Sequence, residues 1–241
     1  MIDRASEEAE RILAEISVPR RPRRIACLTE ETAETLCRLS AGDLIAGVSV
    51  YAERPAEVRT KPKISAFIKA DFAKIEAVKP DLVLCFSDLQ AEIAAECARR
   101  GLEVVVFNQR SIAEILGMVQ ALGALIGREA AAADLVSELR ASLEAVARSA
   151  AGFPRRPRVY FEEWDDPLIS GIRWVSECVA IAGGEDVFPD RAGGKAATER
   201  VVSAQEVVDR RPDLILASWC GKPADLPAIR NREGWDVIPA V

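Results

Sequence analysis

Short apolar runs alternate with amphipathic stretches over the first half of the chain. The runs at 81–86 (DLVLCF) and 102–107 (LEVVVF) are almost continuously apolar, which is typical of parallel strands buried on both faces. Two further strands are expected at 24–28 and 44–50, and three helices at 29–39, 71–78 and 88–100. Strands and helices that alternate with short connections predict an α/β lobe with a mostly parallel sheet.

A long helical stretch, residues 111–150, follows this lobe. Gly123 and Gly127 predict a break within it. Beyond the break, Leu135, Leu139 and Leu143 fall on one stripe of an amphipathic helix. A helix over 128–150 would extend for about 30 Å, the width of a small domain. We therefore expect it to connect two lobes.

The α/β pattern resumes after residue 153. Strands are expected at 159–162, 214–218 and 235–241, and helices at 172–182 and 204–210. The segments 74–84 (KIEAVKPDLVL) and 206–216 (EVVDRRPDLIL) both read as a helix, then Pro-Asp-Leu, then an apolar strand. Because this corner occurs on each side of the long helix, we expect two lobes of similar build.

We expect four parts along the chain. They are a helical extension (1–23), an N-terminal α/β lobe (24–110), linking helices (111–153) and a C-terminal α/β lobe (154–241). We expect a further helix after the final strand, since a buried strand rarely ends a domain uncovered.

The composition limits the chemistry. The chain has no histidine, which removes the commonest general base and metal ligand. Its 32 Lys and Arg against 38 Asp and Glu give a net charge of −6, which argues against a nucleic-acid partner. Six cysteines occur without a CxxC pair, so we expect reduced and mostly buried thiols rather than a zinc site.

No run approaches the roughly 20 apolar residues of a membrane span. Residues 1–16 lack the apolar core of a secretory signal. As given, the sequence predicts a cytoplasmic protein without membrane insertion; a trimmed N-terminus would make it periplasmic or lipid-anchored.

The densest polar cluster is 162–166 (EEWDD), after an expected strand. Its carboxylates could hold Ca²⁺ or Mg²⁺, or act as acid and base. Alternate residues on a strand point opposite ways, so at most half can converge. An acidic loop, a ligand site and a metal-dependent enzyme therefore stay open as alternatives.

Aromatic side chains suggest a ligand with a flat surface. Trp164 and Trp219 follow expected strands, and open α/β sheets bind ligands at the carboxyl ends of their strands. A planar macrocycle would stack well on indoles, while core packing is the alternative. Arg173, beside Trp174 at a helix start, could bind an anionic group.

Several segments resemble the helical-backbone class of ABC-importer substrate-binding proteins, and most closely its vitamin B12-binding branch. The resemblance is carried by segments 24–39 (RIACLTEETAETLCRL), 47–55 (GVSVYAERP), 74–86, 168–188 (LISGIRWVSECVAIAGGEDVF) and 202–218. It implies two α/β lobes joined by one long backbone helix. It also implies a corrinoid held non-catalytically in the cleft between the lobes, with no covalent cofactor.

In that branch, the positions of Tyr51 and Phe67 contact the corrinoid, and segment 162–165 faces the cleft. The expected ligand contacts are Tyr51, Phe67, Glu162, Trp164, Asp165, Arg173 and Trp219, with no metal site. Family members carry a permease-docking acid on each lobe, at positions that fall on Ala73 and Gln205 here. Asp71 and Glu206 lie close by and are the docking candidates.

Three functions are compatible with these observations. The first is corrinoid binding for ABC-type import, and the second is binding of a siderophore or haem for an ABC importer. Without histidine, haem would need Tyr51 as its axial ligand. The third is a metal-dependent enzyme that uses 162–166.

Overall fold

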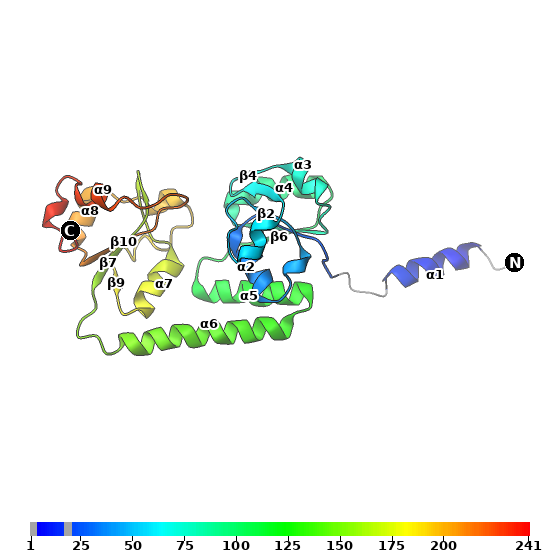
Figure 1. Ribbon diagram of the computed structural model, residues 1–241, viewed down its shortest axis with the longest axis horizontal. Helices are drawn as coiled ribbons and strands as arrows, with labels where there is room; N and C mark the ends of the chain where they lie inside the picture. The colour runs from blue at the N-terminus through cyan, green and yellow to red at the C-terminus, as the bar shows by residue number, and fades with distance from the viewer. Residues whose placement is uncertain (1–3, 17–20) are drawn as a thin grey trace. The chain divides into compact units, whose positions relative to one another are not determined.

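The computed structural model describes residues 4–16 and 21–241 and contains two compact units. Unit 1 comprises residues 1–108 and 119–133, and unit 2 comprises 109–118 and 134–241. Two of the three points at which the chain passes between the units lie within helices α5 (Ile112–Ile126) and α6 (Glu129–Ala150), which Figure 1 labels. The helices at 111–153, which we expected to form a separate linker, are therefore divided between the two units.

Unit 1 contains a six-stranded sheet in the order β4-β3-β2-β1-β5-β6, parallel except for β4. Its strands are β1 (Ile25–Cys27), β2 (Ile45–Ser49), β3 (Lys63–Ala66), β4 (Lys69–Ala70), β5 (Leu82–Phe86) and β6 (Val104–Phe107). Its helices are α1 (Arg4–Ile16), α2 (Glu30–Arg38), α3 (Phe72–Ala77) and α4 (Ala91–Arg99), with 3₁₀ turns at Gly42–Leu44, Ala56–Thr60 and Asp88–Gln90. The core on one face is formed by α3 and α4 packed on β1 and β5. The parallel sheet and its four expected strands are confirmed, while the short β3–β4 hairpin was not predicted.

Unit 2 contains a sheet in the order β10-β7-β8, with β9 paired to β7. Its strands are β7 (Arg158–Asp165), β8 (Leu168–Ser170), β9 (Glu185–Asp186) and β10 (Leu214–Ala217). Its helices are α7 (Arg173–Ile181), α8 (Ala204–Arg210) and α9 (Leu226–Arg230), with 3₁₀ turns at Ala197–Arg200 and Trp235–Val237. The prediction of a strand at 235–241 was wrong, because Trp235–Val237 form a 3₁₀ turn. Trp235 and Ile238 are buried in the core of unit 2, where Trp235 lies 6.3 Å from Tyr160 between ring centroids, whereas Val237 is exposed.

The corner between α3 and β5 in unit 1 is fixed by two long-range interactions. The carboxylate of Asp81 accepts hydrogen bonds from the backbone N–H groups of Arg23 (2.8 Å) and Arg24 (2.9 Å). The guanidinium of Arg24 in turn donates to the carbonyl of Val78 at the end of α3 (2.6 Å). These three hydrogen bonds connect the start of β1 to the corner that precedes its neighbour β5.

The corner between α8 and β10 in unit 2 repeats this arrangement. Asp213 accepts from the backbone N–H of Arg158 (2.8 Å), whose guanidinium donates to the carbonyl of Arg210 (2.6 Å). The residue before the proline is left-handed in both corners, with φ of 46° at Lys79 and 43° at Arg211. The repeated sequence segments therefore form repeated structure, and the expectation of two lobes of similar build is confirmed for this corner.

We predict that Asp213→Asn lowers stability at neutral pH and not in acid. The N–H of Arg158 and the guanidinium of Arg155 hold the pKa of Asp213 below its ordinary 3.8. A carboxyl whose folded pKa is depressed stabilises the fold above its unfolded pKa, and this contribution disappears as pH falls through the folded pKa. Urea midpoints of wild type and variant should therefore differ at pH 7 and converge as pH falls from about 5 to about 2. A difference that stays constant over this range would contradict the assignment.

The two glycines of the long helical stretch have different roles. The break occurs at Gly127, which has φ of +69° and follows the end of α5. Gly123 lies inside α5, and a Cβ at this position would be 2.4 Å from Cβ of Ala132 in α6. Gly123 therefore allows these two helices to pack closely, and the break that we expected at both glycines occurs only at the second.

The six cysteines are all free, but they are less buried than we expected. Cys27, Cys85 and Cys97 are buried, whereas Cys178 and Cys220 are exposed. We predict that a thiol reagent labels Cys178 and Cys220 rapidly in the native protein, while Cys27 and Cys85 react only after unfolding. Burial raises the pKa of Cys27 and Cys85 to about 12 and also raises the pKa of Cys178 and Cys220, so the expected difference in labelling comes from the solvent access of Cys178 and Cys220. Mass spectrometry of labelled peptides would identify the sites, and early labelling of Cys27 would contradict the prediction.

Candidate ligand-binding site

Tyr51 lies two residues beyond the carboxyl end of β2 and has a half-exposed side chain. Its backbone N–H donates to the hydroxyl of Ser49 (3.2 Å), which donates to a carboxylate oxygen of Glu30 (2.7 Å). Ser49 is fully buried, so these bonds fix the turn that carries Tyr51. The phenol is therefore presented to solvent at a strand end, which suits a contact with a ligand.

Phe67 lies in the turn of the β3–β4 hairpin, with a left-handed φ of 44°. Its carbonyl accepts a hydrogen bond from the side-chain amide of Gln90 (2.5 Å). Gln90 is fully buried, and its amide oxygen accepts from the backbone N–H of Phe86 at the end of β5 (2.9 Å). A buried amide thus holds an otherwise unfavourable turn conformation beside a strand end. The sequence analysis missed Gln90, since nothing in its local pattern indicates this contact.

A cavity of about 230 Å³ lies beside the β3–β4 hairpin. Lys63, Lys69 and Lys74 line it together with Asp71. Nζ of Lys74 is 3.3 Å from one carboxylate oxygen of Asp71, and the other oxygen accepts the backbone N–H of Lys74 (3.1 Å). These bonds lower the pKa of Asp71. The acid that we expected to dock a permease therefore lies among lysines.

Glu162, an expected ligand contact, is fully buried in unit 2. Its carboxylate accepts from both terminal guanidinium nitrogens of Arg232 (2.5 and 2.9 Å) and from the indole N–H of Trp219 (2.9 Å). Burial is the main reason that the pKa of the neighbouring Tyr160 is raised, and the charge of Glu162 adds to it. The carboxylate of Glu162 thus neutralises the partly buried guanidinium of Arg232 and does not face solvent.

Glu163 points away from Glu162, as the alternation along a strand requires. Its carboxylate accepts from the guanidinium of Arg200 (2.5 and 3.0 Å). Arg200 is itself buried and donates to the carbonyl of Ser170 in β8 (2.5 Å). The two adjacent glutamates therefore neutralise different arginines on opposite faces of β7. In the part of the chain that the structure describes, no three acidic or cysteine side chains converge as metal ligands.

Trp164 and Trp219 come together at the carboxyl edge of the sheet in unit 2, because β7 and β10 are neighbouring parallel strands. Nζ of Lys222 lies 4.3 Å from the ring centroid of Trp164 and 4.8 Å from that of Trp219. The same ammonium is 2.6 Å from a carboxylate oxygen of Asp165, and it lowers the pKa of that carboxyl. Three of the expected ligand contacts are therefore brought together, around a lysine that the sequence analysis missed.

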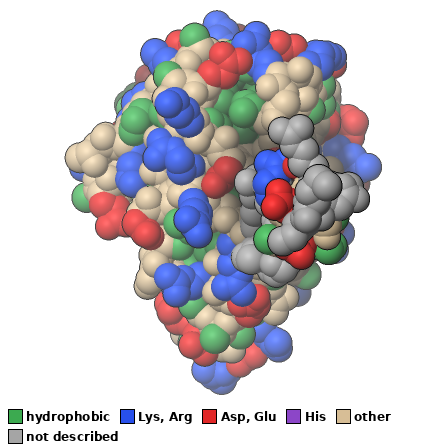
Figure 2. All heavy atoms as spheres, turned by 90° about the vertical axis from the view of Figure 1, so that its right-hand side faces the viewer, with side chains coloured by type: hydrophobic (Ala, Val, Ile, Leu, Met, Phe, Trp, Pro, Cys, Tyr) green, Lys and Arg blue, Asp and Glu red, His purple; other side chains and the backbone are tan. Residues whose placement is uncertain are grey.

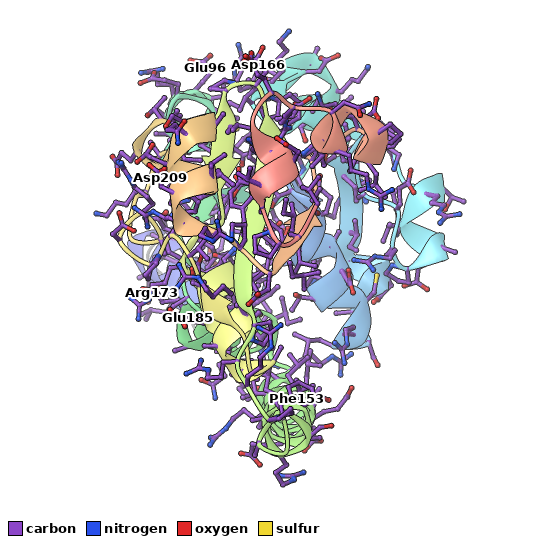
Figure 3. All side chains as sticks on the ribbon, turned by 90° about the vertical axis from the view of Figure 1, so that its left-hand side faces the viewer. Glu96, Phe153, Asp166, Arg173, Glu185 and Asp209 are labelled. Carbon is purple, nitrogen blue, oxygen red and sulfur yellow. The ribbon has the colours of Figure 1, made fainter. Side chains whose placement is uncertain are left out.

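Arg173 is not part of this group. Its guanidinium donates to a carboxylate oxygen of Glu177 one turn along α7 (2.8 Å). Figure 3 shows Arg173 and Glu185 well apart from Asp166, which follows the carboxyl end of β7. The residue expected to bind an anion therefore lies away from the paired indoles and already has an acidic partner.

Glu206, the second docking candidate, caps its own helix. It completes a capping box with Ser203 at the start of α8, and a carboxylate oxygen lies 3.0 Å from the guanidinium of Arg191. The N–H of Ser203 is the main cause of its lowered pKa. In the repeated corner, Glu206 corresponds to Lys74 rather than to Asp71. The two candidate acids thus occupy non-equivalent positions in the two units.

Charges of both signs are mixed on the face that Figure 2 shows. Lys and Arg side chains lie beside Asp and Glu side chains, and no continuous basic patch covers this face. This distribution differs from the uniformly basic surface with which proteins bind nucleic acid.

The chain was compared with known proteins. Residues 25–241 match the model of a family described as periplasmic binding protein. A curated relative, the vitamin B12-binding protein of Vibrio vulnificus (strain YJ016), is 23% identical over 226 residues, which cover 89% of this chain and 81% of the relative.

Solved structures share the fold at low sequence identity. A possible iron-binding, periplasmic solute-binding protein from Staphylococcus epidermidis gives a TM-score of 0.77 at 23% identity, over 91% of this chain and 86% of that one. The periplasmic vitamin B12-binding protein of Vibrio cholerae gives 0.71 at 21% identity, over 90% and 82%. A haem complex from S. aureus gives 0.74 at 21% identity, over 90% and 86%.

Proposed function

Because this chain belongs to the periplasmic binding protein family, we propose that it binds a corrinoid of the vitamin B12 type without catalysing a reaction. The observation that carries the proposal is the presence of aromatic side chains at strand ends in both units. Tyr51 and Phe67 follow β2 and β3 in unit 1, and Trp164 lies at the carboxyl end of β7 in unit 2. Aromatic faces favour a large planar partner such as a corrin ring.

The carboxylates of unit 2 support binding rather than catalysis. Glu162 is bonded to Arg232, Glu163 to Arg200 and Asp165 to Lys222. Each of these carboxylates already has its own cationic partner, and Glu162 is also sealed from solvent, so none is free to exchange a proton with a substrate. We therefore favour a binding protein over a metal-dependent enzyme.

A planar iron chelate, haem above all, is the second candidate ligand. The half-exposed phenol of Tyr51 is a possible axial ligand for haem iron. Proteins described as iron-binding or solved with haem share the fold as closely as the vitamin B12-binding protein does. Because such likeness reports fold alone, only a binding experiment separates the two ligands.

We further propose that the loaded protein delivers its ligand to an ABC permease. Asp71 and Glu206 are the candidate docking acids, although Lys74 and Arg191 already pair with them. A permease arginine would then compete with these internal partners. Within residues 4–16 and 21–241, no helix has the length and hydropathy to cross a membrane.

A thermal-shift screen tests the proposed ligand. A ligand present at 100 times its Kd stabilises the native state by about 2.7 kcal/mol, enough to move the midpoint by several degrees. Cobalamin and cobinamide should raise the unfolding midpoint, and haem and ferric siderophores should leave it unchanged. A shift with haem alone would favour the second candidate and overturn the first.

A further inference from the structure

The ammonium of Lys222 is bound by two indoles and one carboxylate at the edge of unit 2. The indoles of Trp164 and Trp219 lie 4.3 and 4.8 Å from it, and Asp165 lies 2.6 Å away. An exposed lysine–carboxylate pair alone contributes little, but aromatic faces attract a cation through their quadrupole. This combination is a cation cage, by which we mean Trp164, Trp219 and Asp165 together.

The walls of the cation cage are held by bonds that do not involve Lys222. The indole N–H of Trp219 donates to the buried carboxylate of Glu162 (2.9 Å), and that of Trp164 donates to the carbonyl of Asp166 (2.9 Å). Glu162 is in turn fixed by Arg232. Each ring therefore has its own anchor, and the cage should keep its shape when the lysine is removed.

The lysine enters the cation cage from a turn beyond β10. Lys222 follows Gly221, which has a left-handed φ of 77°, and its side chain is 40% exposed. Trp219 is only 8% exposed because it belongs to the buried core of unit 2, and Lys222 lies over its ring. The cage thus opens toward solvent at the place where the lysine lies.

We propose that the cation cage is a binding site for an organic ammonium group of a ligand and that Lys222 fills it in the free protein. A primary or quaternary ammonium would replace the lysine ammonium, since each offers a positive charge to the faces of the two indoles and to the carboxylate. The cation cage shares Trp164 with the proposed corrinoid contacts, but ammonium binding to it does not require a macrocycle, so the two proposals can fail separately.

Tetramethylammonium is a suitable probe, because it carries the charge without a hydrogen-bond donor. Lys222→Ala should bind it about tenfold more tightly than wild type, measured by quenching of tryptophan fluorescence. Lys222→Met should stay as weak as wild type, because its apolar chain still fills the cage. Lys195→Ala, which removes another exposed lysine of unit 2, should also match wild type.

One further variant and one further ligand locate the site. Adding Trp164→Leu to Lys222→Ala should abolish the gain, since one wall of the cation cage is then lost. n-Butylammonium, which resembles the lysine side chain, should raise the urea midpoint of Lys222→Ala and leave wild type unchanged. Circular dichroism would establish that each variant is folded.

The proposal is overturned if folded Lys222→Ala binds tetramethylammonium no better than wild type and gains no stability from n-butylammonium. A gain that persists in the double variant would also overturn it, because binding would then occur elsewhere. Titration of cobalamin into wild type and Lys222→Ala, which both keep Trp164, reports on the proposed function separately.

Discussion

Glu162→Ala should lower the free energy of unfolding by about 3–5 kcal/mol. The substitution leaves the Arg232 guanidinium, only 19% exposed, without the carboxylate that accepts two of its N–H groups. It also removes the acceptor of the Trp219 indole N–H. Removing one partner of a buried pair costs much more than the pair itself contributes, because the remaining charge is left desolvated. Urea denaturation followed by circular dichroism would measure the loss.

Two control variants separate charge from packing. Glu162→Gln keeps an acceptor for Trp219 and should lose less, about 1–3 kcal/mol. Glu185→Ala, at an exposed position in β9, should change stability by less than about 0.5 kcal/mol. A loss below about 1 kcal/mol for Glu162→Ala would mean that the Glu162–Arg232 pair does not hold unit 2 together.

Replacing both Tyr51 and Trp164 by alanine should weaken corrinoid binding by about tenfold to a hundredfold. Each stacked aromatic contributes about 0.5–1.5 kcal/mol beyond its buried area, and effects at separate sites add. Titration calorimetry of the single and double variants measures the affinities. The single variants should each lose about three- to tenfold.

Trp174→Ala is the matched control for this series. Trp174 is also exposed in unit 2, but it lies in the first turn of α7 rather than at a strand end. Its loss should leave the affinity unchanged. A folded double variant that binds cobalamin as tightly as wild type would mean that the ligand contacts other residues.

Periodicity predicted the regular elements well and the irregular ones poorly. The helix expected at 204–210 is α8 as observed, since its capping residues and Pro212 mark both ends. The β3–β4 hairpin was missed because strands of four and two residues are too short to show alternation. At 235–241 the apolar composition was interpreted as a strand, although tertiary packing around Trp235 determines the conformation.

The sequence predicted the candidate site only where the residues concerned lie within one strand or helix. The alternation of Glu162 and Glu163 could be foreseen, and their contacts agree with it. Their partners could not, because Arg200 lies 37 and Arg232 lies 70 residues further along the chain. Lys222 was missed for the same reason, since its contacts exist only once β7 and β10 pair.

Titration calorimetry of the wild-type protein, with cyanocobalamin in one run and haemin in the other, tests the central claim most directly. We expect one corrinoid bound per chain, with a negative heat-capacity change from burial of apolar surface, and no saturable heat with haemin. Saturable binding of haemin with no binding of cyanocobalamin would contradict the account.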